Sequence, residues 1–250
     1  MRRRRIFDIA VLFLTLCAGC QDANRIEQDT FNRANTAYKQ SDYKGAIKLY
    51  QKIISDGVTS QPLHFNLGNA YMKDGQLGRA IAAYERALRL QPRDSDLAAN
   101  LTFARHRMAT PEPEGAKSLG RAMFPHINSI TLDELVIILV VIGIGITILI
   151  LGGLFSHWRF RKTSLFISLL AVLFVFHLFA LFAKVDDLRD RAVVVSTSDV
   201  KYEPEDNATT HFTAYEGWKL RLLKESSGWV KVERSDGLQG WIPKSRVEPI

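Results

Sequence analysis

The stretch HFNLGNAYMKDGQLGRAIAAYERALRLQP, residues 64–92, has the composition of two helices joined by a turn. Apolar and small residues recur at helical spacing on both sides of Gly75, and Pro92 ends the second segment because proline has no N–H to donate. Gly68 and Ala80 are small, which lets two helices approach closely. We therefore expect a helical hairpin. The larger side chains expected between its helices are Leu67, Tyr71 and Tyr84.

This pattern recurs along residues 30–108 with a period near 34 residues. The period and the small and aromatic positions resemble the tetratricopeptide repeat, which implies an α-helical solenoid over residues 24–108. The first copy is degenerate, and the third, Asp94 to Met108, supplies a single capping helix. So short a stack buries its end faces poorly, and we expect it to lean on a partner or on the membrane-proximal linker. The recurring pairs are Ala46–Ile47 with Ala80–Ile81, Tyr50 with Tyr84, and Asn66–Leu67 with Asn100–Leu101.

Tetratricopeptide repeats bind peptides in a groove lined by their first helices, and the resemblance implies such a groove here. Asparagine suits it because the side chain offers a donor and an acceptor to a peptide backbone. The carboxylate-clamp subtype needs basic residues where Phe31 and Ala99 stand, so a C-terminal carboxylate is not implied as the ligand. The asparagines can instead hydrogen-bond between helices, and both interpretations stay open. The candidate groove residues are Asn35, Asn66, Asn69, Lys73, Asn100 and Phe103.

No charged residue interrupts Leu135–Phe155 or Leu165–Ala183. At about 1.5 Å per residue, a helix of either length reaches roughly 30 Å, the thickness of the hydrocarbon core of a membrane. Two such runs are hard to bury in the core of a 250-residue protein. We therefore predict transmembrane helices over residues 132–155 and 164–184, joined by a cytoplasmic loop over residues 156–163.

The net charge of +7 is concentrated beside the apolar runs. Arg2–Arg5 open the chain, and Arg159, Arg161 and Lys162 lie between the two predicted spans. Basic clusters at membrane boundaries set topology, so this charge does not indicate a nucleic-acid partner. The positive-inside rule predicts that the loop lies in the cytoplasm and that both soluble arms lie on the opposite side of the membrane, which is the periplasm if the membrane is a bacterial inner membrane.

Residues 1–19 have the pattern of a signal peptide: a basic start, a short apolar stretch and then small residues. The stretch from Leu16 to Cys20 resembles a bacterial lipobox, which implies lipidation at Cys20, although Cys17 stands where leucine is preferred. Lipidation, plain cleavage and an uncleaved anchor all stay open. Cys17 and Cys20 also form a C-x-x-C motif, but without a surrounding βαβ unit we do not expect redox chemistry.

Residues 109–131 have the proline- and glycine-containing composition of a linker. Beyond the second span, short apolar runs alternate with turns, which predicts five strands in a small all-β barrel over residues 192–250. The stretch from Gly228 to Pro243 (GWVKVERSDGLQGWIP) resembles bacterial SH3-like domains, which often contact cell-wall peptides or other proteins. The aromatic run of eukaryotic SH3 domains is absent, so polyproline binding is not implied. We expect Trp229 and Trp241 near the core, and Tyr215 and Trp218 on an exposed contact surface.

Signatures of enzymes are missing from the sequence. There is no H-E-x-x-H, no metal-ligand spacing of Cys and His, no nucleophile elbow, and no phosphate-binding glycine loop. We therefore predict a non-enzymatic protein with no catalytic residue, metal or cofactor. His177 lies within the second span, where we expect a neutral imidazole bonded to the other helix, near Ser168 or Thr147; a role in transport or catalysis is the weaker alternative.

The order of modules, from signal to repeats to a two-span hairpin to an SH3-like domain, resembles the BatE proteins of bacterial aerotolerance (Bat) operons. The resemblance implies an envelope protein that acts beside Bat proteins with von Willebrand factor A domains and, indirectly, a MoxR-type ATPase. We expect an inner-membrane scaffold for protein–protein interactions on the periplasmic side, linked to aerotolerance or envelope stress. The alternative is a cell-wall sensor or tether that binds peptidoglycan peptides through the SH3-like domain.

Overall fold

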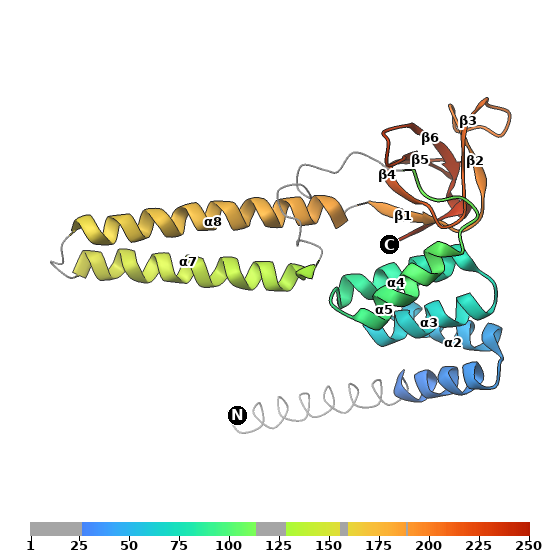
Figure 1. The fold of residues 1–250 in the computed structure, drawn as a ribbon, viewed down its shortest axis with the longest axis horizontal. Helices are drawn as coiled ribbons and strands as arrows, with labels where there is room; N and C mark the ends of the chain where they lie inside the picture. The colour runs from blue at the N-terminus through green and yellow to red at the C-terminus, as the bar shows by residue number, and fades with distance from the viewer. Residues whose placement is uncertain (1–26, 114–128, 156–159, 189) are drawn as a thin grey trace, which may run out of the picture.

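The computed structural model describes residues 27–113, 129–155, 160–188 and 190–250 (Figure 1). They form a helical arm (residues 27–113), a hairpin of two long helices and a β arm (residues 190–250), which confirms the predicted architecture. The predicted signal peptide over residues 1–19, Cys20 and most of the 109–131 linker lie outside the described residues.

The helices of the helical arm begin at side-chain caps. Asp42, Ser60 and Asp94 each accept a hydrogen bond from a backbone N–H in the first turn of the helix that follows. Helix α4 differs, because its N-cap residue, Gln76, makes no side-chain cap bond. The helices are residues 27–39, α2 (Tyr43–Ser55), α3 (Gln61–Lys73), α4 (Leu77–Leu90) and α5 (Ser95–His106).

Packing within the helical arm follows the repeat pattern. A Cβ atom on Gly68 would lie 2.5 Å from Cε1 of Tyr84, so α3 and α4 approach this closely only because residue 68 is glycine. Tyr50, Tyr71 and Tyr84 are buried between the helices. The close helix approach predicted from the small residues is therefore present.

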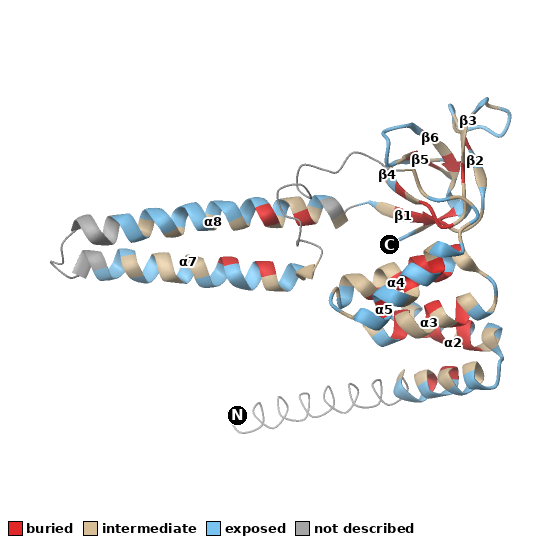
Figure 2. Ribbon diagram, in the orientation of Figure 1, coloured by how far each residue is buried: buried red, intermediate tan, exposed pale blue. Residues whose placement is uncertain are grey.

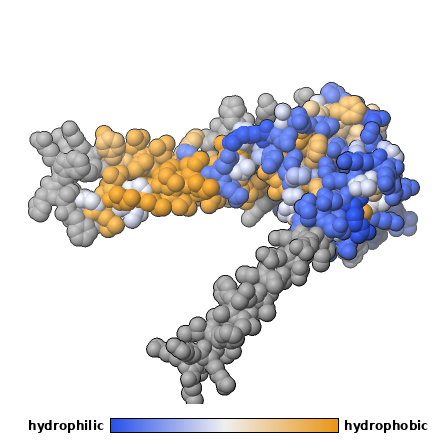
Figure 3. All heavy atoms as spheres, turned by 90° about the horizontal axis from the view of Figure 1, so that it is seen from below, coloured by the Kyte–Doolittle hydropathy of each residue, from blue (hydrophilic) through white to orange (hydrophobic). Residues whose placement is uncertain are grey.

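The two long helices lie side by side as a hairpin. α7 (Leu132–Phe155) has the bounds predicted for the first span. α8 (Phe160–Leu188) extends beyond the predicted 164–184 at both ends, because no glycine or proline interrupts it. Both helices are long and apolar enough to span a membrane, and many of their large apolar side chains are exposed (Figures 2 and 3). A hydrocarbon medium suits such a surface.

Two polar side chains within the hairpin form hydrogen bonds with their own helices. Nδ1 of His177 lies 2.9 Å from the carbonyl oxygen of Leu173, one turn earlier in α8. Thr147 Oγ1 donates to the carbonyl oxygen of Gly143 at 2.9 Å in α7. The expected bond between His177 and the other helix is therefore wrong, because a carbonyl four residues earlier is already within reach.

The β arm is one antiparallel sheet of seven strands in the order β3-β2-β6-β5-β4-β1-β7. The sequence predicts only five strands, because β2 and β7 are four and three residues long and show little apolar alternation. The strands are β1 (Arg191–Val194), β2 (Ser198–Lys201), β3 (Thr210–Ala214), β4 (Lys219–Ser226), β5 (Trp229–Glu233), β6 (Gln239–Pro243) and β7 (Val247–Pro249).

The two arms pack against each other where α4 meets the β1–β7 end of the sheet. Val193 of β1 is fully buried in the hydrophobic cluster of the helical arm, which also contains Ile81 of α4, and Ile250 packs against that cluster. The described part of the short repeat stack thus leans on the chain's own β arm. We call the two arms together the head.

The head lies at one end of the hairpin (Figure 1). Arg93, in the loop before α5, forms an ion pair with Glu134 of α7 at 3.0 Å. Arg221 of β4 pairs with Asp186 of α8 at 3.3 Å. Each arm is therefore tied to the nearer end of a different long helix.

Candidate peptide-binding site

A pocket of about 290 Å³ opens among residues 27–39, α2 and α3. It brings together three of the predicted groove residues, Asn35, Asn66 and Asn69. The remaining lining residues, which sequence reasoning missed, are Tyr38, Lys39 and Tyr50.

The other predicted groove residues lie outside this pocket. Asn100 donates to the carbonyl oxygen of Asp96 in its own helix at 3.0 Å. Phe103 is 58% exposed on α5, and Lys73 is exposed at the end of α3. The pocket therefore belongs to the first two repeats and does not reach the capping helix α5.

The same asparagine–tyrosine hydrogen bond occurs in each of these repeats. Tyr50 Oη donates to Asn35 Oδ1 at 2.6 Å, and Tyr84 Oη donates to Asn69 Oδ1 at 2.7 Å. Both pairs are 15 residues apart, and the second follows the first by one repeat period. Asn66 Nδ2 donates to Asn35 Oδ1 at 3.1 Å. The repeated spacing is the sequence signal by which Tyr50 could have been assigned to the pocket.

These bonds fix how the asparagine amides face the pocket. Burial, with a smaller contribution from Tyr38, raises the pKa of Tyr50 to about 12, so its hydroxyl stays protonated and donates. Asn35 therefore presents Oδ1 to the tyrosine and turns Nδ2 away. Among the described residues, the Nδ2 groups of Asn35 and Asn69 have no hydrogen-bond acceptor. Each could donate a hydrogen bond to the carbonyl oxygen of an extended peptide.

The β arm packs against the central repeat at the start of α4. Glu216 Oε1 accepts a hydrogen bond from the backbone N–H of Gly78, in the first turn of α4, at 2.8 Å. A Cβ atom on Gly78 would lie 2.5 Å from the carbonyl oxygen of Val194 and 2.8 Å from Cα of Val195. Only glycine at position 78 permits this approach of α4 to the sheet.

Charged pairs surround the contact between the arms. Lys219 Nζ lies 3.3 Å from Glu85 Oε1, and Arg105 of α5 binds the same carboxylate. Burial would raise the pKa of Glu85, but Lys219 and Arg105 outweigh it and hold this pKa below its usual range. Arg86 pairs with Glu248 at 2.6 Å and also donates to the carbonyl oxygen of Pro249.

Trp218 is 3% exposed, so the prediction that it lies on an open surface is wrong. Residues 108–113 lie against it, and its Nε1 donates to the carbonyl oxygen of Thr110 at 3.0 Å. Tyr215 packs edge-on against the Trp218 ring, with 5.1 Å between ring centroids, and is half-buried. Trp229 and Trp241, expected near the core, are half-buried on β5 and β6.

Residues 62–94 match the family described as tetratricopeptide repeat, and residues 201–249 match the family described as bacterial SH3 domain. The first match covers α3 and α4, and the second runs from the end of β2 through β7. No curated protein matches the chain. The chain therefore contains two module classes that generally mediate interactions, one in each arm. Within the described residues, no group of three or more His, Cys, Asp and Glu side chains could hold a metal ion.

Proposed function

We propose that the protein is a non-enzymatic, membrane-anchored scaffold whose helical arm binds an extended segment of a partner protein. The observation that supports this most strongly is the pair of asparagine donors, Asn35 and Asn69, which buried tyrosines orient at one pocket. Amide side chains that bind a peptide backbone accept many partner sequences. Lys39, exposed in the pocket lining, adds attraction for an acidic residue of the partner.

We further propose that the head lies in the periplasm of a bacterial inner membrane. Arg159, between the two long helices, and Arg161 and Lys162, at the start of α8, support a cytoplasmic connection between α7 and α8. The contact between the arms requires both to lie on one side of the membrane, as a two-helix hairpin allows. Reporter fusions in the 156–163 loop and after Ile250 test this topology. A cytoplasmic reporter that is active after Ile250 would overturn it.

For the partner we propose Bat proteins with von Willebrand factor A domains and, through them, a MoxR-type ATPase, in a complex linked to aerotolerance or envelope stress. The order of the modules along the chain supports this proposal, because it resembles the BatE proteins. The two module matches are consistent with a role in assembling other proteins.

A photo-cross-linking residue at position 39, in the pocket lining, tests the groove in membranes that contain a co-expressed von Willebrand factor A-domain Bat protein. We expect a cross-link to that protein. The same residue at position 48, exposed on α2 outside the pocket, is the control and should give none.

Asn69→Asp sharpens the test, because it keeps an acceptor for Tyr84 but replaces the Nδ2 donor with an oxygen. We expect it to reduce the cross-link strongly. Asn100→Asp makes the same chemical change at a residue outside the pocket and should leave the cross-link intact. Equal cross-linking from positions 39 and 48, or an unchanged yield in Asn69→Asp, would overturn the groove assignment.

The second candidate is a cell-wall sensor or tether that binds peptidoglycan peptides through the β arm, which the match to the bacterial SH3 domain favours. Because α4 covers one end of the sheet, the test uses the full chain in detergent rather than an isolated β arm. Sedimentation with purified sacculi that is unaffected by Asn69→Asp would support this candidate. An absence of co-sedimentation would remove it.

A further inference from the structure

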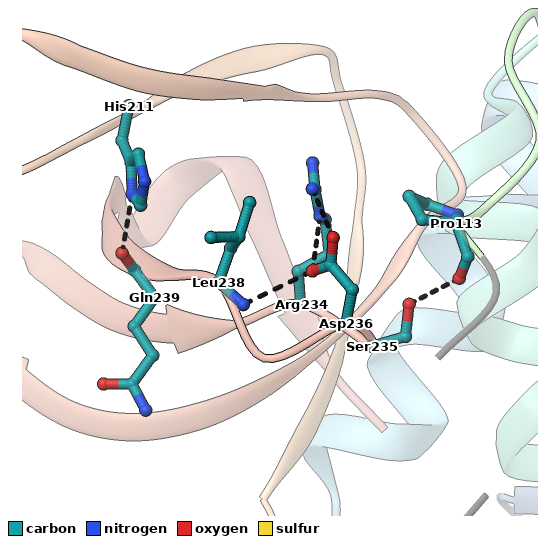
Figure 4. A network of polar contacts seen from close by, with 7 residues as sticks. All are labelled: Pro113, His211, Arg234, Ser235, Asp236, Leu238 and Gln239. Carbon is teal, nitrogen blue, oxygen red and sulfur yellow. Dashed lines mark hydrogen bonds and ion pairs between the residues drawn. The ribbon is translucent and has the colours of Figure 1, made fainter. Parts of the chain in front are cut away.

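A short segment between the two arms lies against the β arm, beside Trp218. After α5, residues 108–113 adopt neither helix nor strand, and we call them the strap. Trp218 Nε1 donates to the carbonyl oxygen of Thr110 at 3.0 Å. Ser235 Oγ donates to the carbonyl oxygen of Pro113 at 2.5 Å, as Figure 4 shows. Two turns of the β arm therefore hold the strap by its backbone.

The aromatic rings beside these two turns also contact a charged side chain of the β arm. Arg234 binds Asp236 through Nε at 2.9 Å and Nη2 at 2.5 Å (Figure 4). Its guanidinium lies 4.7 Å from the ring centroid of Phe212 and 5.9 Å from that of Trp218. Cation–π contacts and the Arg234–Asp236 ion pair thus hold a guanidinium against both rings within the β arm.

The strap has the chemistry of an extended ligand. Pro111 and Pro113 have fixed φ angles and no N–H to satisfy, which favours an extended backbone with outward carbonyl groups. Glu112 is partly buried beside Lys219 and Arg105; burial raises the pKa of Glu112, although both cations oppose the shift. Met108 packs against the hydrophobic clusters of both arms.

We propose that the face formed by Trp218, Tyr215 and Arg234 is a second peptide-binding site, which takes extended segments containing proline and glutamate, and that the strap is its resident ligand. A partner segment of the same chemistry competes with the strap for the site. The strap is tethered, so its effective concentration is on the order of mM, and a free peptide binds weakly until the strap leaves. This site lies on the other arm from the groove and does not depend on it.

The experiment uses the full chain in lipid nanodiscs and a fluorescently labelled peptide with the strap sequence, MATPEP. Glu112→Lys replaces one of the two carboxylates near Lys219 and Arg105 with a third positive charge, leaving only Glu85 among the described residues to balance them, and should release the strap. We expect this variant to bind the peptide at least about tenfold more tightly than the unmodified chain, as measured by fluorescence anisotropy. Hydrogen exchange should also rise in the peptide fragment that contains residues 108–113.

Trp218→Phe in the Glu112→Lys background keeps an aromatic ring but removes the Nε1–H donor, and should weaken peptide binding by roughly fivefold or more. Glu203→Lys, the same charge change at an exposed residue between β2 and β3, should behave like the unmodified chain. A peptide with alanine in place of both prolines should bind more weakly. The proposal fails if Glu112→Lys raises neither hydrogen exchange nor peptide affinity, if only the exchange rises, or if Trp218→Phe leaves the affinity unchanged.

Discussion

The carboxylate of Glu216 accepts a hydrogen bond from the backbone N–H of Gly78, a residue 138 positions earlier in the chain, at 2.8 Å. Both long helices lie between these residues in sequence. The N-cap residue of α4, Gln76, makes no side-chain cap bond, so Glu216 satisfies an N–H that a local side chain usually satisfies. The central repeat of the helical arm is thus completed by the β arm.

Glu216→Ala should destabilise the head, because it removes this cap. The expected loss in the free energy of unfolding is about 0.5–2 kcal/mol, the usual cost of a lost N-cap. Thermal unfolding of the full chain in detergent measures it. Glu225→Ala removes a carboxylate from an exposed pair with Lys244 and should cost little. Equal shifts for the two variants would contradict the capping role.

Gly78→Ala should also destabilise the head, although alanine has a higher helix propensity than glycine. In an exposed helix this change stabilises by about 1 kcal/mol. Here the added Cβ would lie 2.5 Å from the carbonyl oxygen of Val194, so the arms must move apart. Gly145→Ala, in α7 with open space around the position, is the control and should not lower the unfolding temperature. A higher unfolding temperature in Gly78→Ala would show that the arms do not touch here.

Charge reversal at Arg86 and Glu248 tests the ion pair that joins α4 to β7 at 2.6 Å. Arg86→Glu and Glu248→Arg should each lower the unfolding temperature, because each places like charges together. The double variant should recover part of the loss, with a coupling energy of about 0.5–3 kcal/mol in a double-mutant cycle. Recovery stays incomplete because Arg86 also donates to the carbonyl oxygen of Pro249. Strictly additive losses would contradict the pair.

His64 should make the head sensitive to mild acid. Burial, with a smaller contribution from Arg86, lowers the pKa of His64 to about 4, and its Nδ1 has no hydrogen-bond partner among the residues that the structure describes. In the unfolded chain the His64 imidazole binds a proton near pH 6.5. Above that pH, His64 is neutral in both states and does not change the free energy of unfolding. The free energy of unfolding declines between about pH 6.5 and pH 4 by up to about 1.4 kcal/mol per pH unit.

His64→Gln should flatten that decline, and chemical denaturation of the full chain at several pH values measures it. The control is His106→Gln, a change at an exposed residue at the end of α5. Parallel stability curves for the unmodified chain and His64→Gln would show that His64 does not carry the acid sensitivity.

Features that depend on local pattern could be predicted from the sequence. The small residue at position 68 predicts the close approach of α3 and α4, and the run without charges from Leu135 to Phe155 predicts all of α7 except its first turn. The contact between the arms could not be predicted in this way. The repeat pattern explains one face of α4, whereas Gly78 and Ala82 are buried as well, on a helix that is covered on more than one side.

In the candidate sites too, local sequence pattern predicts some features, and contacts between distant parts of the chain decide the others. Asn35, Asn66 and Asn69 follow from repeat position, but the limit of the pocket depends on where the helices actually lie. The sequence predicts Trp218 on an exposed surface, but it lies in the hydrophobic cluster of the β arm, and a segment 108 residues earlier in the chain accepts its Nε1–H. A contact with a distant segment leaves no local pattern in the sequence.

A thiol cross-link between positions 86 and 248 decides whether the two arms form one head in the membrane. The protein carries serine in place of Cys17 and Cys20, together with Arg86→Cys and Glu248→Cys, and a short bis-thiol reagent is added to intact membranes. We expect an intramolecular cross-link at high yield. Arg86→Cys with Asp206→Cys, in the loop beside the opposite edge strand β3, should give none. Equal yields for the two pairs, or no cross-link between positions 86 and 248, would contradict a single head.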